Sequence, residues 1–340
     1  MAARFAPTPT AAVLFFSGVV AIVVALVSGA LLAHLIAALV FSFLGVSVVL
    51  AARSLEGLTV TLEVQPTAYD GDDVALRFEV RNSGRRARSL VEITSRFYAA
   101  TTPEGSVTAL AADVAPGGTA AVTGEVPGLR RGEHVFEPPW LSSGDPFGLF
   151  TTARQMDERV TPTRRLTVFP KPFPIDYLSI ASDLSWSISG LEPTNQAGAS
   201  GDFLGTREYR PGDSVRAIHW PLSARMGELI VKEFERNAST EVSIFMDLDA
   251  KAAWGQGREH TFEYAVRIAA SVSEYATRRG NSVQLVAHAS QWVILPPGKG
   301  VYHQLMIMHY LAAFVPTTAP PFHFVIGQMA PRLKEGASAV

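Results

Sequence analysis

Apolar side chains dominate the first fifty residues, and this stretch gives the strongest pattern in the chain. Residues 11–52 contain no Asp, Glu, Lys or Arg. A single helix over this length would measure roughly 60 Å, about twice the thickness of the hydrocarbon core of a bilayer. Two membrane-spanning helices of about 20 residues each, with a turn near Ser28 and Gly29, fit the length better. The sequence therefore predicts a transmembrane helical hairpin.

The charges that flank this stretch indicate its orientation. Arg4 precedes the predicted hairpin and Arg53 follows it, so both ends lie on one side, which the positive-inside rule makes cytoplasmic. We expect a multi-pass protein of the inner (cytoplasmic) membrane, with its soluble domains facing the cytoplasm. The alternative is a cleaved signal peptide that ends near residues 27–33. It would leave residues 35–52 as one uncharged stretch and reverse the orientation.

The hydrophobic period changes to two after residue 57. Apolar side chains alternate with polar ones over residues 58–64 and again over residues 74–80, as in half-buried strands. Further short apolar stretches follow, separated by the turn signals "RNSG", "APGG" and "RRGE". Short strands without long helices predict an Ig-like β-sandwich over residues 57–165.

The last third of the chain shows an α/β pattern. Residues 183–202 are rich in Ser, Gly, Pro, Asn and Ala and predict a loop. The apolar run of residues 240–250 ends in acids, as a buried parallel strand does, and helical and strand-like patterns alternate after it. We therefore expect an N-terminal tail with two transmembrane helices over residues 1–56, the β-sandwich over 57–165, a linker with a charged motif over 166–239, and an α/β domain over 240–340 that is incomplete at its C-terminus.

Composition narrows the possible functions. The chain has no cysteine, which excludes disulfides, thiolate metal sites and cysteine nucleophiles. The formal net charge is -2 for 340 residues, and without a long basic stripe we expect no nucleic-acid binding.

Residues 205–235, "GTREYRPGDSVRAIHWPLSARMGELIVKEFE", are unusually dense in charge, with five basic and five acidic side chains. Because aromatic and turn residues separate these charges, we expect a hydrogen-bonded network around Trp220 that serves as a structural element or a docking surface. Asp213 and Ser223 are expected to cap short helical turns that begin at Ser214 and Ala224. His219 and Trp220 would pack as the apolar side of these turns.

Two alternatives assign chemistry to this part of the chain. Asp213, His219 and Ser223 have the residue types of a hydrolase triad, but no Gly-x-Ser-x-Gly elbow exposes the serine. Asp247 and Asp249 lie at the carboxyl end of the strand predicted over residues 241–247 and could form a divalent-metal adhesion site with Mg²⁺. Lys251 would compete with such a cation, so we expect these acids to cap the strand end and to pair with Lys251 or an arginine of the motif. No cofactor is expected.

The motif resembles the signature of a bacterial family known as domain of unknown function fifty-eight. The matching positions are Arg207, Tyr209, Gly212, Asp213, Arg216, Ile218, Trp220, Ser223, Ala224, Arg225, Lys232, Glu233, Phe234 and Glu235. The stretch "GDPFGLF" (residues 144–150) and the membrane hairpin match the layout of that family as well.

This resemblance implies a von Willebrand factor A-like domain that begins at residues 241–247. Such domains carry an Asp-x-Ser-x-Ser metal-adhesion motif at that strand end, and here the matching positions are Asp247, Asp249 and Lys251, so only the first acid is retained. The resemblance also implies a non-enzymatic assembly protein whose partners are a MoxR-type AAA+ ATPase and a transglutaminase-like membrane protein.

Overall fold

The structure is a computed structural model that describes residues 4–100, 102–178, 203–211, 213–234, 241–333 and 338–340. It divides into two compact units. The first comprises Met1–Lys171 together with Met308–Val315, and the second comprises Pro172–Ile307 together with Pro316–Val340.

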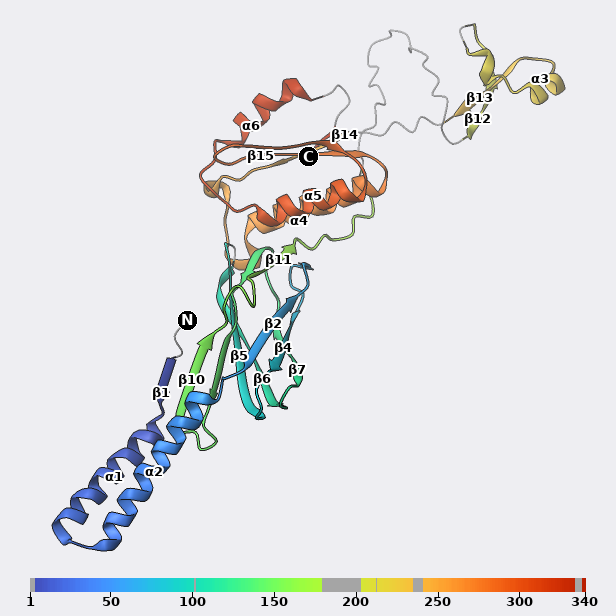
Figure 1. Cartoon of the computed structure of the whole chain (residues 1–340). Helices are drawn as coiled ribbons and strands as arrows, with labels where there is room; N and C mark the ends of the chain where they lie inside the picture. Colours follow the sequence, from blue (N-terminus) through green and yellow to red (C-terminus); the bar gives the residue numbers. More distant parts are fainter. Residues whose placement is uncertain (1–3, 101, 179–202, 212, 235–240, 334–337) are drawn as a thin grey trace. The chain divides into compact units, whose positions relative to one another are not determined.

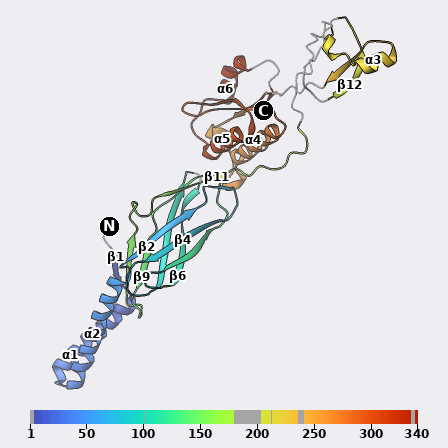
Figure 2. The same cartoon turned by 45° about the vertical axis from the view of Figure 1, so that its right-hand side comes forward.

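Two helices, α1 (Pro9–Ser28) and α2 (Leu31–Arg53), lie side by side at the start of the first unit (Figures 1 and 2). Gly29, with φ of 67°, ends α1 in the left-handed conformation that glycine adopts without steric cost. The predicted turn near Ser28 is therefore confirmed. Both helices are long and apolar enough to cross a membrane. At about 1.5 Å per residue, α1 is about 30 Å long, which matches the hydrocarbon core of a bilayer.

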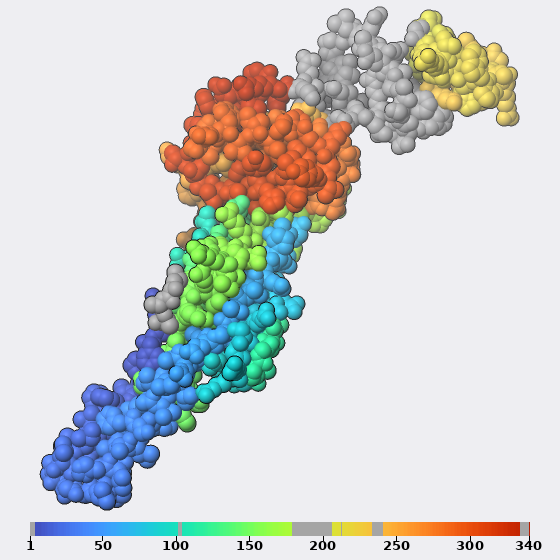
Figure 3. Space-filling model, viewed as in Figure 1, coloured from blue at the N-terminus to red at the C-terminus, as the bar shows by residue number. Residues whose placement is uncertain are grey.

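Small side chains allow the two helices to approach closely. The buried positions of α1 are Ala11, Gly18 and Ala25, which recur every seven residues. A Cβ atom added to Gly18 would lie 3.0 Å from Cγ1 of Val40 on α2, so a larger residue has no room there. The two helices lie in the blue part of the space-filling view (Figure 3). Most other apolar side chains of the pair are exposed. Such a surface suits contact with lipid.

The remainder of the first unit is built from two sheets. The larger has eight strands in the order β1-β10-β9-β5-β8-β11-β3, with β6 paired to β5. Its strands are β1 (Arg4–Pro7), β3 (Thr67–Tyr69), β5 (Arg88–Ala99), β6 (Thr102–Val114), β8 (Gly132–Phe136), β9 (Trp140–Gly144), β10 (Phe150–Gln155) and β11 (Arg164–Phe169). The smaller sheet has the order β2-β4-β7. Its strands are β2 (Leu58–Val64), β4 (Val74–Asn82) and β7 (Thr119–Val126). Strand β11 extends the first sheet to Phe169, beyond the predicted boundary at residue 165.

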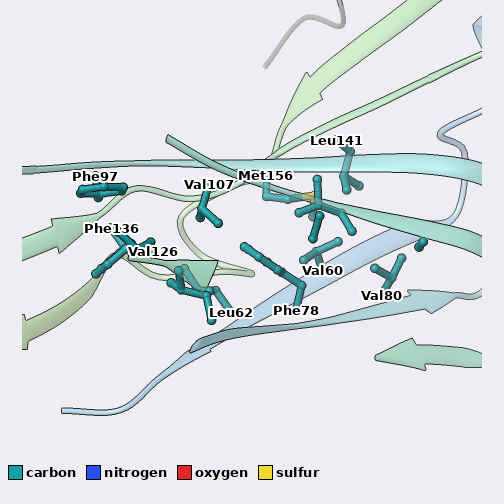
Figure 4. Packing of buried hydrophobic residues seen from close by; sticks show 14 of the residues in the cluster. Val60, Leu62, Phe78, Val80, Phe97, Val107, Val126, Phe136, Leu141 and Met156 are labelled. Carbon is teal, nitrogen blue, oxygen red and sulfur yellow. The ribbon is translucent and has the colours of Figure 1, made fainter. Parts of the chain in front are cut away.

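One hydrophobic core lies between these two sheets (Figure 4). Every second residue of β4 is buried, and Phe78 at its centre has no exposed surface. Phe136 of β8 and Leu141 of β9 are buried in the same cluster from the opposite sheet. The period of two predicted for β2 and β4 is therefore confirmed, and it marks the face of each strand that meets the other sheet.

Both ends of the helical pair join this sandwich of sheets. Before α1, the strand β1 pairs with β10, with Phe5 opposite Thr152. After α2, the chain enters β2 at Leu58, and the hydroxyl of Thr152 donates a hydrogen bond of 2.9 Å to the carbonyl of Ala51. The segments that precede and follow the hairpin thus lie on the same side of it.

The second unit contains a four-stranded sheet in the order β16-β15-β14-β17. Its strands are β14 (Glu241–Met246), β15 (Ser282–His288), β16 (Trp292–Gly298) and β17 (Ser338–Ala339). Strand β14 runs parallel to β15 and β17, whereas β16 is antiparallel to β15. The predicted α/β pattern is present.

Helices cover both faces of this sheet (Figure 1). They are α4 (Thr261–Arg278), α5 (Gly300–Ala313) and α6 (Phe322–Met329). Val325 and Met329 of α6 pack against Val286 of β15. On the other face, the side-chain amide of Gln304 on α5 donates to the hydroxyl of Ser273 on α4 at 3.0 Å. Short 3-10 helices follow some elements, namely η2 (Ala250–Ala252), η3 (Gly257–Glu259) and η4 (Ala330–Arg332).

Candidate functional site

The charged motif forms a hairpin, which we call the signature hairpin (residues 203–234). Strands β12 (Phe203–Glu208) and β13 (Ile230–Phe234) pair antiparallel. Between them lie a 3-10 helix, η1 (Val215–Ala217), and a short helix, α3 (Trp220–Met226). The amide of His219 donates to the carbonyl of Ile230 at 2.7 Å, so this hydrogen bond connects the segment between the two strands to β13. Gly212, Glu235 and the side chain of Glu233 lie outside the described part of the chain.

A bidentate ion pair connects the two ends of the first loop of this hairpin. The guanidinium of Arg207 on β12 donates two hydrogen bonds of 2.7 Å to the carboxylate of Asp213. The backbone amide of Arg210 donates to the same carboxylate at 2.8 Å. The side-chain hydrogen bonds from Arg207, followed by the one from the Arg210 amide, lower the pKa of Asp213 to about 2. The carboxylate therefore stays ionised at neutral pH and links Asp213 to the Arg207 side chain and to the backbone of Arg210.

The caps predicted for this segment are wrong. Asp213 does not cap η1, because Arg207 and the Arg210 amide occupy its carboxylate. Ser223 does not begin a turn but lies inside α3, which starts at Trp220 with His219 as its N-cap. The imidazole Nδ1 of His219 accepts from the amide of Leu222 at 3.2 Å. A proline at the start of α3 favours this earlier helix start, since its ring sets the backbone angle of the first turn.

Ser223 links α3 to β13 instead. Its hydroxyl is buried, accepts from the amide of Ile230 at 2.9 Å and donates to the carbonyl of Ile230 at 3.4 Å. Within the described residues, no hydrogen bond joins the side chains of Asp213, His219 and Ser223 to one another. Each of the three is engaged with a different structural partner, so the hairpin does not assemble the triad that sequence order alone allowed.

The outer surface of the signature hairpin is both aromatic and basic. Trp220 is 59 % exposed, so the expectation that it packs as the apolar side of a turn is wrong. Among the hairpin side chains that the structure describes, the other large apolar ones that are exposed belong to Val215, Met226 and Leu229. Arg216, Arg225 and Lys232 are exposed as well, whereas Tyr209 is half-buried. We call Val215, Arg216, Trp220, Arg225, Met226, Leu229 and Lys232 the exposed hairpin surface.

The two carboxylates after β14 are used by the local backbone. Oδ1 of Asp247 accepts from the amide of Asp249 at 2.9 Å, and Oδ1 of Asp249 accepts from the amide of Lys251 at 3.1 Å. Asp249 thereby caps η2. The predicted ion pair with the Lys251 ammonium is absent from the described part of the chain. The same residues contain no group of three His, Cys, Asp or Glu side chains that could hold a metal ion.

Two charged residues outside the charged motif are buried, which the sequence did not indicate. Arg131, in the turn predicted from "RRGE", is 1 % exposed and donates to the carbonyls of Leu311, Ala312 and Phe314 at the end of α5. It satisfies carbonyls that a helix terminus leaves without partners. Asp145 is buried in the turn between β9 and β10. A charged residue in a turn is normally exposed, so neither position could be identified as buried from its type.

The fold identifies the chain as a multi-sheet α/β protein with two N-terminal helices that are long and apolar enough to cross a membrane. Residues 205–333 match the family model described as "Protein of unknown function DUF58". This match over residues 205–333 supports the family resemblance that the signature motif predicted. The "Uncharacterized protein YeaD" of Bacillus subtilis is 28 % identical over 192 residues, which cover 55 % of this chain and 44 % of that relative. The match thus spans less than half of the relative's length.

Two of the similar solved structures each cover 33 % of the chain. One is the CARDB domain of a Pyrococcus furiosus protein in complex with di-metal ions, with a TM-score of 0.21, 12 % identity, and coverage of 33 % of this chain and 86 % of that one. Another is a beta-glucosidase of Streptomyces venezuelae in complex with D-glucose, with a TM-score of 0.22, 16 % identity, and coverage of 33 % and 15 %. Likeness at this level carries no argument about what this chain binds.

Proposed function

We propose that this chain is a membrane-anchored, non-enzymatic docking protein, and that the signature hairpin binds a cytoplasmic protein partner. The observation that carries this proposal is the combination of a rigid frame with an exposed aromatic residue. Arg207 and Asp213 fix one loop of the hairpin, Ser223 fixes α3 to β13, and Trp220 stands exposed between them. An exposed tryptophan on a preorganised frame loses little conformational freedom on binding.

The composition of the exposed hairpin surface favours a protein partner with an acidic patch. Tryptophan and arginine are the residue types that most often dominate the energy of protein interfaces. Among the side chains described in this hairpin, the exposed cations Arg210, Arg216, Arg225 and Lys232 outnumber the exposed acids Glu208 and Glu228. An acidic partner surface would complement this charge and accelerate association.

The resemblance to the family supports the finer assignments. It favours a MoxR-type AAA+ ATPase as the partner. It also favours a von Willebrand factor A-like fold for the domain that contains β14, and the parallel neighbours of β14 and the helices on both faces of its sheet support this fold. We assign the sandwich an Ig-like fold. Arg4 and Arg53 flank the apolar helices and support a cytoplasmic orientation under the positive-inside rule.

The test is an affinity capture of the full chain, solubilised in detergent from its native membrane, followed by mass spectrometry. Wild type should retain an AAA+ ATPase, and Arg216→Ala should lose it. The side chain of Arg216 is exposed and makes no hydrogen bond or ion pair within the described residues, so the substitution should leave the fold intact.

A matched control is Arg85→Ala, because Arg85 is an exposed arginine in the sandwich rather than in the hairpin. It should retain the ATPase as the wild type does. Equal capture by wild type, Arg216→Ala and a Trp220→Ala variant would contradict the assignment of the docking surface.

A further inference from the structure

The turn between β9 and β10, which we call the anchor turn (residues 145–150), is held in one conformation by a buried carboxylate. The side chain of Asp145 accepts from three backbone amides, those of Phe147 at 3.0 Å, Leu149 at 2.9 Å and Phe150 at 2.7 Å. Gly148 adopts φ of 69°, a conformation that a side chain would disfavour. The turn is therefore preorganised and does not adapt its shape to its surroundings.

The anchor turn is bonded directly to the start of the first apolar helix. Thr8 is the N-cap of α1. Its amide donates to the carbonyl of Leu149 at 2.9 Å, and its hydroxyl donates to the carbonyl of Gly148 at 2.8 Å. Leu149 is buried in a small cluster with Ala11 of α1 and Leu44 of α2. The turn thus lies at the level where the apolar pair begins.

Exposed aromatic rings gather at this level. Phe147 is 54 % exposed and its ring lies 4.6 Å from the ring of Phe43 on α2, measured between centroids. Phe5 is 44 % exposed and stacks on Phe150 at 5.3 Å. Phe43 precedes the end of α2 at Arg53 by ten residues, or about 15 Å of helix. The turn therefore lies alongside the apolar helix rather than beyond its end.

We propose that the anchor turn is a third membrane contact, at which Phe147 of the turn and Phe5 of the adjoining strand β1 insert into the interfacial layer of the bilayer. Aromatic side chains concentrate at this depth in membrane proteins, and the apolar surface of the turn is continuous with that of α1 and α2. The Asp145 carboxylate keeps the turn folded while its own charge is satisfied by backbone amides. The exposed surface of the anchor turn would therefore contact the interfacial layer of the lipid bilayer. The inference rests on the proposed membrane anchorage, and it adds that the sandwich is held against the bilayer surface.

The absence of cysteine from the sequence allows a direct test by spin labelling at single introduced cysteines. Phe147→Cys, Val20→Cys and Tyr98→Cys would each be labelled in the full chain, reconstituted in phospholipid vesicles. Accessibility to oxygen, which partitions into the bilayer, is then compared with accessibility to a water-soluble nickel chelate. Val20 is exposed on α1, and Tyr98 is exposed on β5. Because Glu92 lies opposite Ser142, Tyr98 is about 20 Å further along β5, away from the turn.

The Phe147 label should show an oxygen-to-nickel ratio several-fold above that of the Tyr98 label and below that of the Val20 label. A Phe147 ratio equal to that of Tyr98, with Val20 still in lipid, would overturn the inference and leave the helical anchor standing. Protection of Phe147 from both reagents would also overturn it, because protein rather than lipid would then cover the turn. A Val20 label fully accessible to nickel would instead refute the membrane anchorage itself.

Discussion

The sandwich and the signature hairpin place their large aromatic side chains in opposite ways. In the sandwich, the largest apolar residues of β4 and β8, such as Phe78 and Phe136, have no exposed surface and meet across two sheets. In the hairpin, the tryptophan is exposed, and the interior is fixed by an ion pair and by the bonds of Ser223. Hydrophobic burial therefore dominates the stability of the sandwich, whereas directed polar bonds set the shape of the hairpin.

This difference shows what each region is suited to do. A buried aromatic residue contributes to stability and is unavailable to a partner. An exposed one contributes little to stability, and it can bury its surface only against something else. The two regions should therefore respond in opposite ways to the loss of a large aromatic side chain.

The largest expected effect is that of Phe78→Ala in the sandwich core. Removing a fully buried phenylalanine should lower the free energy of unfolding by about 3–5 kcal/mol, because contacts are lost and a cavity remains. Hydrogen exchange followed by mass spectrometry should show faster exchange in peptides from β2, β4 and β7, by about two to four orders of magnitude. Leu110→Ala, at an exposed position of β6, is the control and should change exchange little. Unchanged exchange in Phe78→Ala would show that this core does not stabilise the sheets.

A smaller effect is expected from Asp145→Ala in the anchor turn. Three backbone amides would lose a charged acceptor, so the free energy of unfolding should fall by about 2–3 kcal/mol. Asp145→Asn keeps one acceptor oxygen and should lose less. Thermal melting of the full chain in detergent measures both variants, and equal midpoints for Asp145→Ala and wild type would contradict the role given to the carboxylate.

The Asp213 ion pair predicts a dependence on pH that is confined to the hairpin. The pKa of this carboxyl falls from 3.8 to about 2 on folding. Its contribution is therefore fully present above pH 4 and is lost as the pH falls through 2. Peptides from β12 and β13 should keep their exchange protection, corrected for intrinsic rates, from pH 7 down to 4 and lose part of it below that. Arg207→Gln removes the main cause of the shift and should move the loss to higher pH. An identical profile in this variant would refute the ion pair as the cause.

Patterned burial could be predicted from the sequence, and specific polar pairing could not. The alternation around Val60 and Phe78 gave β2 and β4, and the uncharged stretch with Ser28 and Gly29 gave the helical hairpin, because periodicity and length act locally. The side-chain partner of Asp213 could not be chosen, because Arg210 and Arg216 are nearer to it in sequence than its actual partner Arg207.

Burial of isolated polar residues also escaped prediction. Arg131 is buried because it meets the end of α5, about 180 residues further along the chain. The exposure of Trp220 contradicted the usual preference of its residue type. Such contacts depend on tertiary structure, which a local sequence pattern does not encode.

The central claim is that Trp220 belongs to a docking surface, and its most direct test is a substitution that should change stability least. Trp220→Ala should shift the thermal midpoint of the full chain in detergent very little, because its side chain is exposed and surface substitutions usually change stability by less than about 0.5 kcal/mol. The same preparation should lose the AAA+ ATPase in affinity capture, while Leu110→Ala retains it. A lowered midpoint with undiminished capture would contradict the account and make Trp220 a structural residue like Phe78.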